Sequence, residues 1–291
     1  MKKAEISASL LAVLVCLVVV LTVPFVMASS SATHTVSLAV VGTNTPTIDA
    51  VDPIAAQDVT PGSTKTITFS FTVSDNDGYT NLNDSSASAY FTKSGETTRS
   101  NTSCSVTNID WNTNNYTCAV AMQFYDAAGT WNVNVSINDK DGRHAENATT
   151  TFTYNTGLHM TMTPTAVSFG TNLVAGQQDV AATDDPIVIT NKGNVNITQV
   201  NVTAYALIGE TLPAYSISAS NFEANDADAA GGDTLVNATA ITVNGVTANR
   251  GASSSDSVYF YLDVPSSNIQ PQTYSTSGGT VWNIGVYGTS S

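Results

Sequence analysis

The chain has 291 residues, of which only 11% are charged, and 9 Lys and Arg residues stand against 23 Asp and Glu residues. This length suffices for two hydrophobic cores, since β-rich chains commonly divide into units of roughly 100 residues. A formal net charge of -14, with no basic stripe, argues against nucleic acid as a partner because such a chain repels phosphate.

The amino terminus has the pattern of a targeting segment. Two lysines precede an apolar run over residues 10–27, and Ala28 ends a group of compact residues that suits a signal peptidase. The main interpretation is export with residues 1–28 removed as a signal peptide. The run also approaches the about 17 residues that span a bilayer, so an uncleaved membrane anchor is a second interpretation. A pilin-type leader cut after Ala4 is a third.

Residues 29–45 are predicted to form an N-terminal strand or linker. Val36, Leu38 and Val40 alternate with polar or small residues, which is the period of a strand. This segment is interpreted either as an edge strand or stalk, or as a donor strand that completes a neighbouring subunit's sheet.

Residues 46–155 have the short, closely spaced strands of a β-sandwich, and seven strands are expected. Trp131, Val133, Val135 and Ile137 share one face, which predicts a half-buried strand, interpreted as an outer strand of the sandwich. The expected strands are one near Ile48 and those at residues 64–73, 87–92, 98–106, 116–124, 131–138 and 149–154.

Two stretches carry a resemblance to a known family. Residues 128–142, AGTWNVNVSINDKDG, resemble the penultimate strand of the PKD and related immunoglobulin-like modules of archaeal and bacterial surface proteins. Residues 71–78, FTVSDNDG, resemble an earlier strand of these modules running into its Asp/Gly loop. The resemblance covers about residues 46–155 and implies an immunoglobulin-like fold, in modules that serve as spacers, adhesins or carbohydrate binders.

The cysteines agree with export. Cys16 leaves with the signal or sits in the membrane, so Cys104 and Cys118 remain as a pair that is predicted to form a disulfide. Cys118 shares a face with Val120 and Cys104 with Val106, which predicts that both point into the core from adjacent strands. Three scattered histidines and no CxxC spacing argue against a zinc site.

Two Asp/Gly loops of this region contain four carboxylates, those of Asp75, Asp77, Asp139 and Asp141. In an immunoglobulin-like layout these loops emerge at the same end, where carboxylates, carbonyls and water would suit calcium. The alternative is two ordinary Asp/Gly turns without a metal. No other cofactor is expected.

Residues 156–291 are predicted to form a second β-sandwich, with strands at 187–190, 195–204, 258–264 and 281–287. The inward phase changes between Ile197 and Val200, which predicts a bulge near Thr198 and Gln199. The turn at residues 191–194, NKGN, is similar to hairpins of the TasA-like surface and filament proteins.

No catalytic motif of the nucleophile-elbow, zincin or phosphate-loop type is present in the sequence. Glu223, Asp226, Asp228 and Asp233 fall in or beside an acidic loop that is interpreted as solvated, with calcium as the alternative. Tyr259 and Tyr261 are expected on an outer sheet face, either as cross-strand pairs or as a carbohydrate platform.

Eight Asn-x-Ser/Thr sequons occur, a number that chance alone would give. Asn134, Asn196 and Asn201 fall on the predicted outward phase of their strands, so they are the candidate glycosylation sites. The sequons begin at Asn83, Asn101, Asn115, Asn134, Asn147, Asn196, Asn201 and Asn237.

Taken together, the sequence predicts an all-β protein of two tandem immunoglobulin-like sandwiches after an N-terminal signal or anchor helix. The leading functional hypothesis is a secreted or cell-surface structural or adhesive protein without catalytic activity, whose partners are the cell envelope, other surface proteins or further copies of itself. The alternatives are a subunit of an extracellular filament and a carbohydrate-binding module or β-glycosidase.

Overall fold

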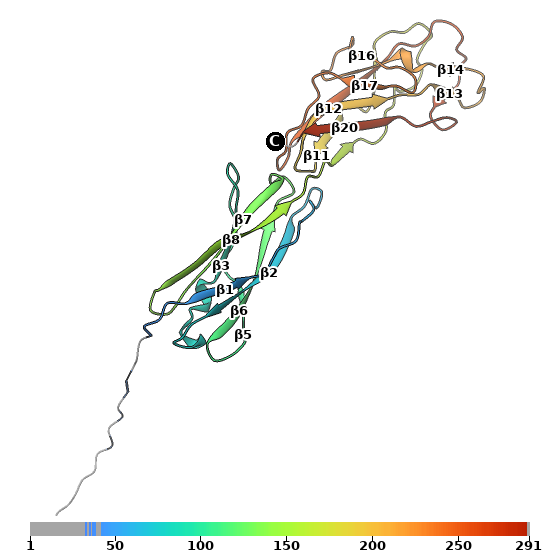
Figure 1. Ribbon diagram of the computed structural model, residues 1–291. Coiled ribbons are helices and arrows are strands. Elements are labelled where there is room, and N and C mark those ends of the chain that lie inside the picture. Colours follow the sequence, from blue (N-terminus) through green and yellow to red (C-terminus); the bar gives the residue numbers. More distant parts are fainter. Residues whose placement is uncertain (1–32, 34, 36, 39–41, 290–291) are drawn as a thin grey trace, which may run out of the picture. The chain divides into compact units, whose positions relative to one another are not determined.

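The computed structural model describes residues 33, 35, 37, 38 and 42–289, which are organised almost entirely as β-strands (Figure 1). The helices of this part are three single turns, none long and apolar enough to cross a membrane. They are the 3-10 turns η1 (Tyr79–Asn81), η2 (Asp84–Ser86) and η3 (Ala219–Asn221). The all-β class predicted from the sequence is confirmed.

The predicted signal or anchor of residues 1–28 lies outside the described residues. So does part of residues 33–41, the alternating segment within the predicted N-terminal strand or linker of residues 29–45. Its described residues, Thr33, Thr35, Ser37 and Leu38, have no strand assignment, and Leu38 is 85% exposed.

Two four-stranded antiparallel sheets enclose a first hydrophobic core (Figure 1). The rings of Phe69 and Phe91, one from each sheet, lie 5.6 Å apart across this core. The first sheet has the order β1-β2-β6-β5, with β1 (Thr47–Val51), β2 (Lys65–Ser74), β6 (Thr113–Met122) and β5 (Ser105–Asn108). The second has the order β4-β3-β7-β8, with β4 (Arg99–Asn101), β3 (Ser88–Thr92), β7 (Gly129–Asn138) and β8 (His144–Tyr154).

Strand β7 shows how the alternation of the sequence builds this core. Trp131, Val133, Val135 and Ile137 are each at most 1% exposed, as predicted from their period of two. Burying side chains of this size stabilises the fold by about 1.5–3 kcal/mol each. The interpretation of β7 as an outer strand was wrong, because β7 pairs with β3 on one side and with β8 on the other.

The strand predicted over residues 98–106 is in fact two strands in different sheets. Strand β4 pairs with β3, and strand β5 pairs with β6. Residues 102–104 therefore carry the chain from one sheet to the other. The predicted seven strands become eight because of this crossing.

A second hydrophobic core is built from strands of the remaining chain. Its largest sheet has the order β16-β15-β18-β11-β9, with β10 also pairing with β18. Its strands are β16 (Asp233–Thr234), β15 (Phe222–Asn225), β18 (Ser255–Leu262), β11 (Ile187–Asn191), β9 (Met160–Thr163) and β10 (Val180–Ala181). Two smaller sheets are β17 (Ala240–Val243), β12 (Asn196–Thr203) and β20 (Asn283–Thr289), and β14 (Ser216–Ile217), β13 (Leu207–Gly209) and β19 (Tyr274–Ser275).

Strand β12 contains the irregularity predicted from the phase change. Its pairing with β20 shifts register between Ile197 and Gln199. Ile197, Val200 and Val202 are all at most 1% exposed, so the bulge lets both halves of the strand face the core.

The turn at residues 191–194 is not the predicted hairpin. Strand β11 pairs with β9 and β18, whereas β12 pairs with β17 and β20, so this turn crosses between sheets. Asn191 is fully buried, and its Nδ2 donates to the carbonyl oxygens of Val195 and Ala248 at 2.7 and 3.0 Å. A Cβ on Gly193 would lie 2.0 Å from the carbonyl oxygen of Gly157, so only glycine fits there.

Candidate functional site

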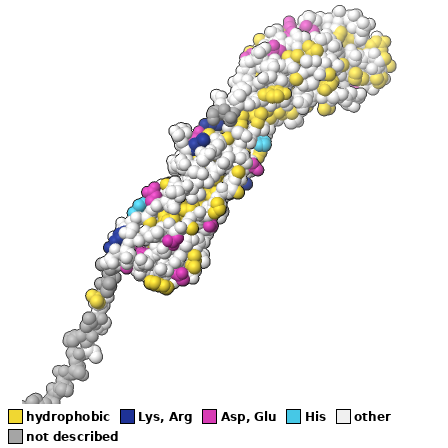
Figure 2. Space-filling model, in the orientation of Figure 1, with side chains coloured by type: hydrophobic (Ala, Val, Ile, Leu, Met, Phe, Trp, Pro, Cys, Tyr) yellow, Lys and Arg dark blue, Asp and Glu magenta, His cyan; other side chains and the backbone are white. Residues whose placement is uncertain are grey.

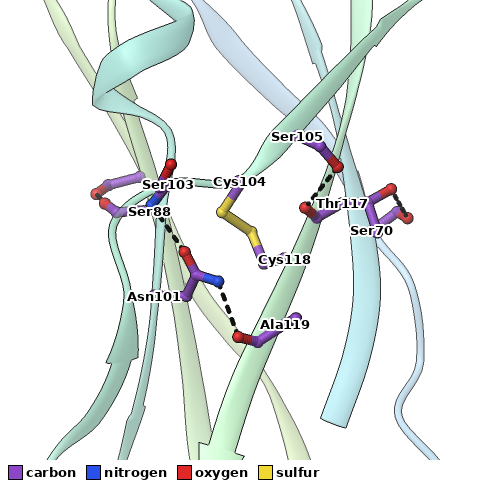
Figure 3. Close-up of a disulfide and its surroundings, with 10 residues drawn as sticks. Ser70, Ser88, Asn101, Ser103, Cys104, Ser105, Thr117, Cys118 and Ala119 are labelled. Atoms are coloured by element: carbon purple, nitrogen blue, oxygen red, sulfur yellow. Dashed lines mark hydrogen bonds between the residues drawn. A yellow bond between two sulfur atoms is a disulfide. The ribbon is translucent and has the colours of Figure 1, made fainter. Parts of the chain in front are cut away.

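A disulfide between Cys104 and Cys118 fastens the sheet crossing to strand β6 (Figure 3). The two Cα atoms are 4.4 Å apart, and both residues are buried. Because Asn101 ends β4 and Ser105 begins β5, Cys104 lies on the crossing segment itself. The predicted pairing of the two cysteines is confirmed.

Asn101 and Val106 flank this crossing. The Asn101 side chain donates to the carbonyl oxygen of Ala119 at 2.8 Å and accepts from the backbone N–H of Ser103 at 2.7 Å. Val106, which was predicted to share the core-facing side of Cys104, is 41% exposed. That prediction was wrong because Cys104 is not in a strand and β5 is an edge strand.

The first Asp/Gly loop uses its carboxylates within its own surroundings. Asp75 is 1% exposed, and it accepts from the backbone N–H of Asp77 at 2.9 Å and from Nδ2 of Asn81 at 3.4 Å. Asp77 accepts from the backbone N–H and the side-chain Nδ2 of Asn44 at 2.6 and 2.7 Å. These hydrogen bonds, the backbone one first, lower the pKa of Asp77. Asp77 thus holds the segment before β1 against the loop after β2.

The second Asp/Gly loop is closed in a similar way. Asp139 is 2% exposed, and its Oδ1 accepts from the backbone N–H groups of Asp141 and Arg143 at 2.9 and 2.7 Å. The Arg143 guanidinium lies 3.4 Å from a carboxylate oxygen of Asp139 and of Asp141. Asp139 therefore serves as the acceptor that forms the turn.

The two loops lie side by side, with η1 between them. The backbone N–H of Lys140 donates to the carbonyl oxygen of Asn81 at 2.8 Å, and Asn81 in turn reaches Asp75. Within the described part of the chain, however, no group of three or more His, Cys, Asp or Glu side chains is arranged to hold a metal ion. The calcium site of Asp75, Asp77, Asp139 and Asp141 gains no support from this arrangement and stays a prediction.

Tyr261 does not lie on an exposed sheet face as predicted. It is 7% exposed, because β10 and β15 flank it on strand β18, where it pairs with Ala181 and Glu223. Its hydroxyl donates to Oδ1 of Asp228 at 2.7 Å. Desolvation, followed by this hydrogen bond, raises the pKa of Tyr261 to about 12. Tyr259 is only half-buried, so the pair does not form the platform that motivated a carbohydrate site.

Asp185, beside β18, was not singled out from the sequence. Its Oδ2 accepts from the backbone N–H of Phe260 at 2.7 Å, whereas its Oδ1 is buried without a hydrogen-bond partner. Desolvation is the main cause that raises the pKa of Asp185 to about 6. The hydrogen bond from Phe260 lowers this pKa, whereas the negative charges of Asp228 and Asp184 raise it. No local pattern indicates this residue, because its contact with Phe260 joins positions 75 residues apart.

Two more carboxylates in or beside the acidic loop, those of Glu223 and Asp233, accept local hydrogen bonds. Glu223 accepts from the backbone N–H of Gly231 at 2.8 Å. Asp233 accepts from the backbone N–H and the side chain of Asn244 at 2.9 and 2.8 Å. These two carboxylates therefore bind separate partners, and neither binds the partner of Asp228, which is Tyr261.

An open depression of about 320 Å³ lies beside β13. Glu210 is the one titratable side chain in its lining, and it accepts from the hydroxyls of Ser275 and Ser277 at 2.7 and 3.4 Å. Within the described lining this is one carboxyl group, whereas a glycosidase of the usual kind uses two. The visible surface is mostly neither charged nor hydrophobic (Figure 2).

The three candidate glycosylation sites differ in their surroundings. Asn201 is only 9% exposed, although it alternates with Val200 and Val202 of the core; it lies in β12 between β17 and β20. Asn134 donates to Glu146 at 2.5 Å, and its buried Oδ1 has no hydrogen-bond partner in the described part of the chain. Asn196 is half-buried and accepts from the backbone N–H of Arg250 at 2.7 Å.

Comparison with protein-family models gives no match, and comparison with curated proteins gives none. Among solved structures, the chain is similar to a DUF4466 family protein from Parabacteroides merdae, with 13% sequence identity over 76% of this chain and 98% of that chain. The TM-score is 0.19, so this likeness supports no conclusion about fold or function.

Proposed function

We propose that the protein is exported and serves as a structural or adhesive component of the cell surface, without catalytic activity. The observation that carries this proposal is the buried disulfide between Cys104 and Cys118. Structural disulfides form and persist in oxidising compartments and are rare in the cytosol. The apolar run of residues 10–27 supplies a route of export.

The proposal includes a finer account of the fold. Residues 46–155 form an immunoglobulin-like sandwich of the kind found in PKD modules, and residues 156–291 form a second sandwich. Support comes from the two four-stranded sheets around the first core and from the separate second core. The neighbours in this role are the cell envelope and other surface proteins.

The test is the thiol state and location of the full chain in the cells that make it. Cells are treated with a membrane-impermeant protease and, separately, quenched with an alkylating reagent before lysis. The proposal expects a protease-accessible protein in which Cys104 and Cys118 are found as one disulfide-linked peptide pair. A protease-protected protein with both thiols alkylated would overturn it.

A filament subunit is the second candidate, favoured by the free edge of β5. All four residues of β5 are exposed, and so are the large side chains of Ile109 and Trp111 in the turn that follows. An edge of this kind accepts an added strand, and residues 35–41 of another copy have the strand period to supply one. Electron microscopy of the full chain should then show polymers that are lost on deletion of residues 29–42; monomers in both samples would remove this candidate.

A further inference from the structure

The eight sequons of the chain are not equivalent once their surroundings are compared. A glycan attaches to the amide nitrogen of asparagine, so the acceptor side chain must reach solvent and must not be needed by the fold. Seven of the eight asparagines are buried or half-buried, and all seven lie in or beside strands or turns of the sheets. Asn237 is the one that is exposed.

The amide nitrogens set two further sequons apart from Asn237. Nδ2 of Asn101 donates to Ala119, and Nδ2 of Asn134 donates to Glu146. A glycan on either would replace one of the two N–H hydrogens and would have to fit beside that acceptor. The amide nitrogen of Asn201 has no hydrogen-bond partner among the described residues. The residue as a whole, however, is buried between two neighbouring strands.

Asn237 lies in the turn between β16 and β17, outside any strand. Its Oδ1 accepts from the backbone N–H of Ala206 at 3.2 Å, which orients the side chain and leaves Nδ2 without a partner among the described residues. Ala238 has a φ of 56°, and the backbone N–H of Thr239 bonds to the carbonyl oxygen of Val236 at 3.1 Å. The three sequon residues, Asn237, Ala238 and Thr239, are all exposed.

We propose that Asn237 is an N-glycosylation acceptor, with a lipid-linked oligosaccharide phosphate as the donor substrate. Nδ2 forms a bond to the anomeric carbon C1 of the sugar and gives up one proton to a base of the transferase. The bond from C1 to the phosphate oxygen breaks, and the lipid phosphate leaves with the electron pair. The attached glycan covers the neighbouring Val236, which is 47% exposed.

This inference rests on the proposed export, because glycan transfer of this type occurs outside the cytosol. Acceptor competence is nevertheless a property of the folded chain and is measured without export. The purified, disulfide-bonded full chain is incubated with a lipid-linked oligosaccharide and a single-subunit oligosaccharyltransferase that accepts Asn-x-Ser/Thr sequons. Peptide mass spectrometry then gives the occupancy of each of the eight sites.

The expected result is occupancy of Asn237 at least about tenfold above that of Asn201, since the latter is buried in its sheet. Asn237→Asp keeps the oxygen that accepts from Ala206 and should abolish the modification at this site. Thr239→Ala should also abolish it, whereas Thr239→Ser should retain it, and Asn201→Asp should leave the glycan pattern unchanged. If Asn237 of the folded chain stays unmodified, the inference is overturned, whether or not other sequons are modified.

A separate measurement distinguishes this failure from failure of the proposed export. The protein from its own cells is analysed for both the site occupancy and the disulfide. A disulfide-bonded surface protein without a glycan on Asn237 would overturn the inference alone. A cytosolic protein with free thiols would overturn the proposed function, while the in vitro result would still decide whether Asn237 is a competent acceptor.

Discussion

The hydroxyl of Tyr261 donates a hydrogen bond to the carboxylate of Asp228 at 2.7 Å, joining strand β18 to the tip of a loop 33 residues away. Asp185 contacts the same strand at the neighbouring residue, where its carboxylate accepts from the backbone N–H of Phe260. Two carboxylates and a buried phenol thus surround one stretch of β18. Desolvation, with a smaller contribution from the negative charge of Asp228, raises the pKa of Asp185 beside this stretch.

Asp185→Asn is expected to change how stability depends on pH. The folded pKa of Asp185 is raised from 3.8 to about 6, so its neutral form is favoured by folding. The stability that this group contributes is complete below pH 3.8 and is lost as the pH rises through about 6. Denaturant unfolding of both proteins at several pH values across this window measures the difference. The wild type should lose stability relative to Asp185→Asn as the pH rises; parallel curves would contradict the prediction.

Arg99→Ala should destabilise the first core strongly. Asp126 is 1% exposed, and Nε of Arg99 donates to its two carboxylate oxygens at 3.1 and 2.9 Å. Removing one partner of a buried ion pair leaves an uncompensated charge and costs about 3–5 kcal/mol. The control is Lys93→Ala, which removes a half-buried cation whose Nζ donates to the carbonyl oxygen of Thr130 at 3.4 Å and which should cost far less, since no buried charge is left without its partner. Equal midpoints for the two variants in urea would count against this role of Arg99.

Gly193→Ala should lower the thermal midpoint. A Cβ at this position would lie 2.0 Å from a backbone oxygen, so the crossing between β11 and β12 must shift. Overpacking of this kind costs about 1–3 kcal/mol. Gly251→Ala is the matched control because its Cβ would meet its nearest neighbour, a Ser254 side chain, at 3.8 Å. Calorimetry of both variants measures the thermal midpoints. An unchanged midpoint for Gly193→Ala would show that the crossing can adapt to the added Cβ.

Reduction of the disulfide should lower the free energy of unfolding. Cys104 and Cys118 are 14 residues apart, and closing a loop of this length stabilises by about 3 kcal/mol through the unfolded state. The measurement is urea unfolding with and without a reductant. The double variant Cys104→Ala with Cys118→Ala controls for the reagent and should not respond to it. If the wild type also failed to respond, the bond would contribute nothing to stability.

The long, regular strands were predictable because the alternation of apolar and polar residues that indicates a strand lies within the strand itself. Ile67, Phe69 and Phe71 on β2 are all buried, as their alternation predicts. The bulge after Ile197 was also predictable, because a change of phase within one strand requires an extra residue. The cysteine pair followed once Cys16 was assigned to the amino-terminal apolar run, because only Cys104 and Cys118 then remain.

The rest depended on which strands become neighbours, which local patterns do not encode. The break between β4 and β5 arises because each half pairs with a different sheet. Tyr261 is covered by β10, a strand of two residues that is too short to carry a period. The turn after β11 has the composition of a hairpin, yet buried hydrogen bonds from Asn191 hold it as a crossing between sheets.

The position of the disulfide also has a mechanical consequence. In a protein that is pulled from its two ends, the segment between Cys104 and Cys118 cannot extend, because the covalent bond carries the load past it. With a separation of 14 residues, about 45–50 Å of contour length is withheld at roughly 3.3–3.6 Å per residue. The edge strand β5 and half of β6 lie within this protected loop. If the first core unfolds under force, the disulfide still holds this loop closed. The unfolded chain is therefore shorter, and refolding at low force is favoured.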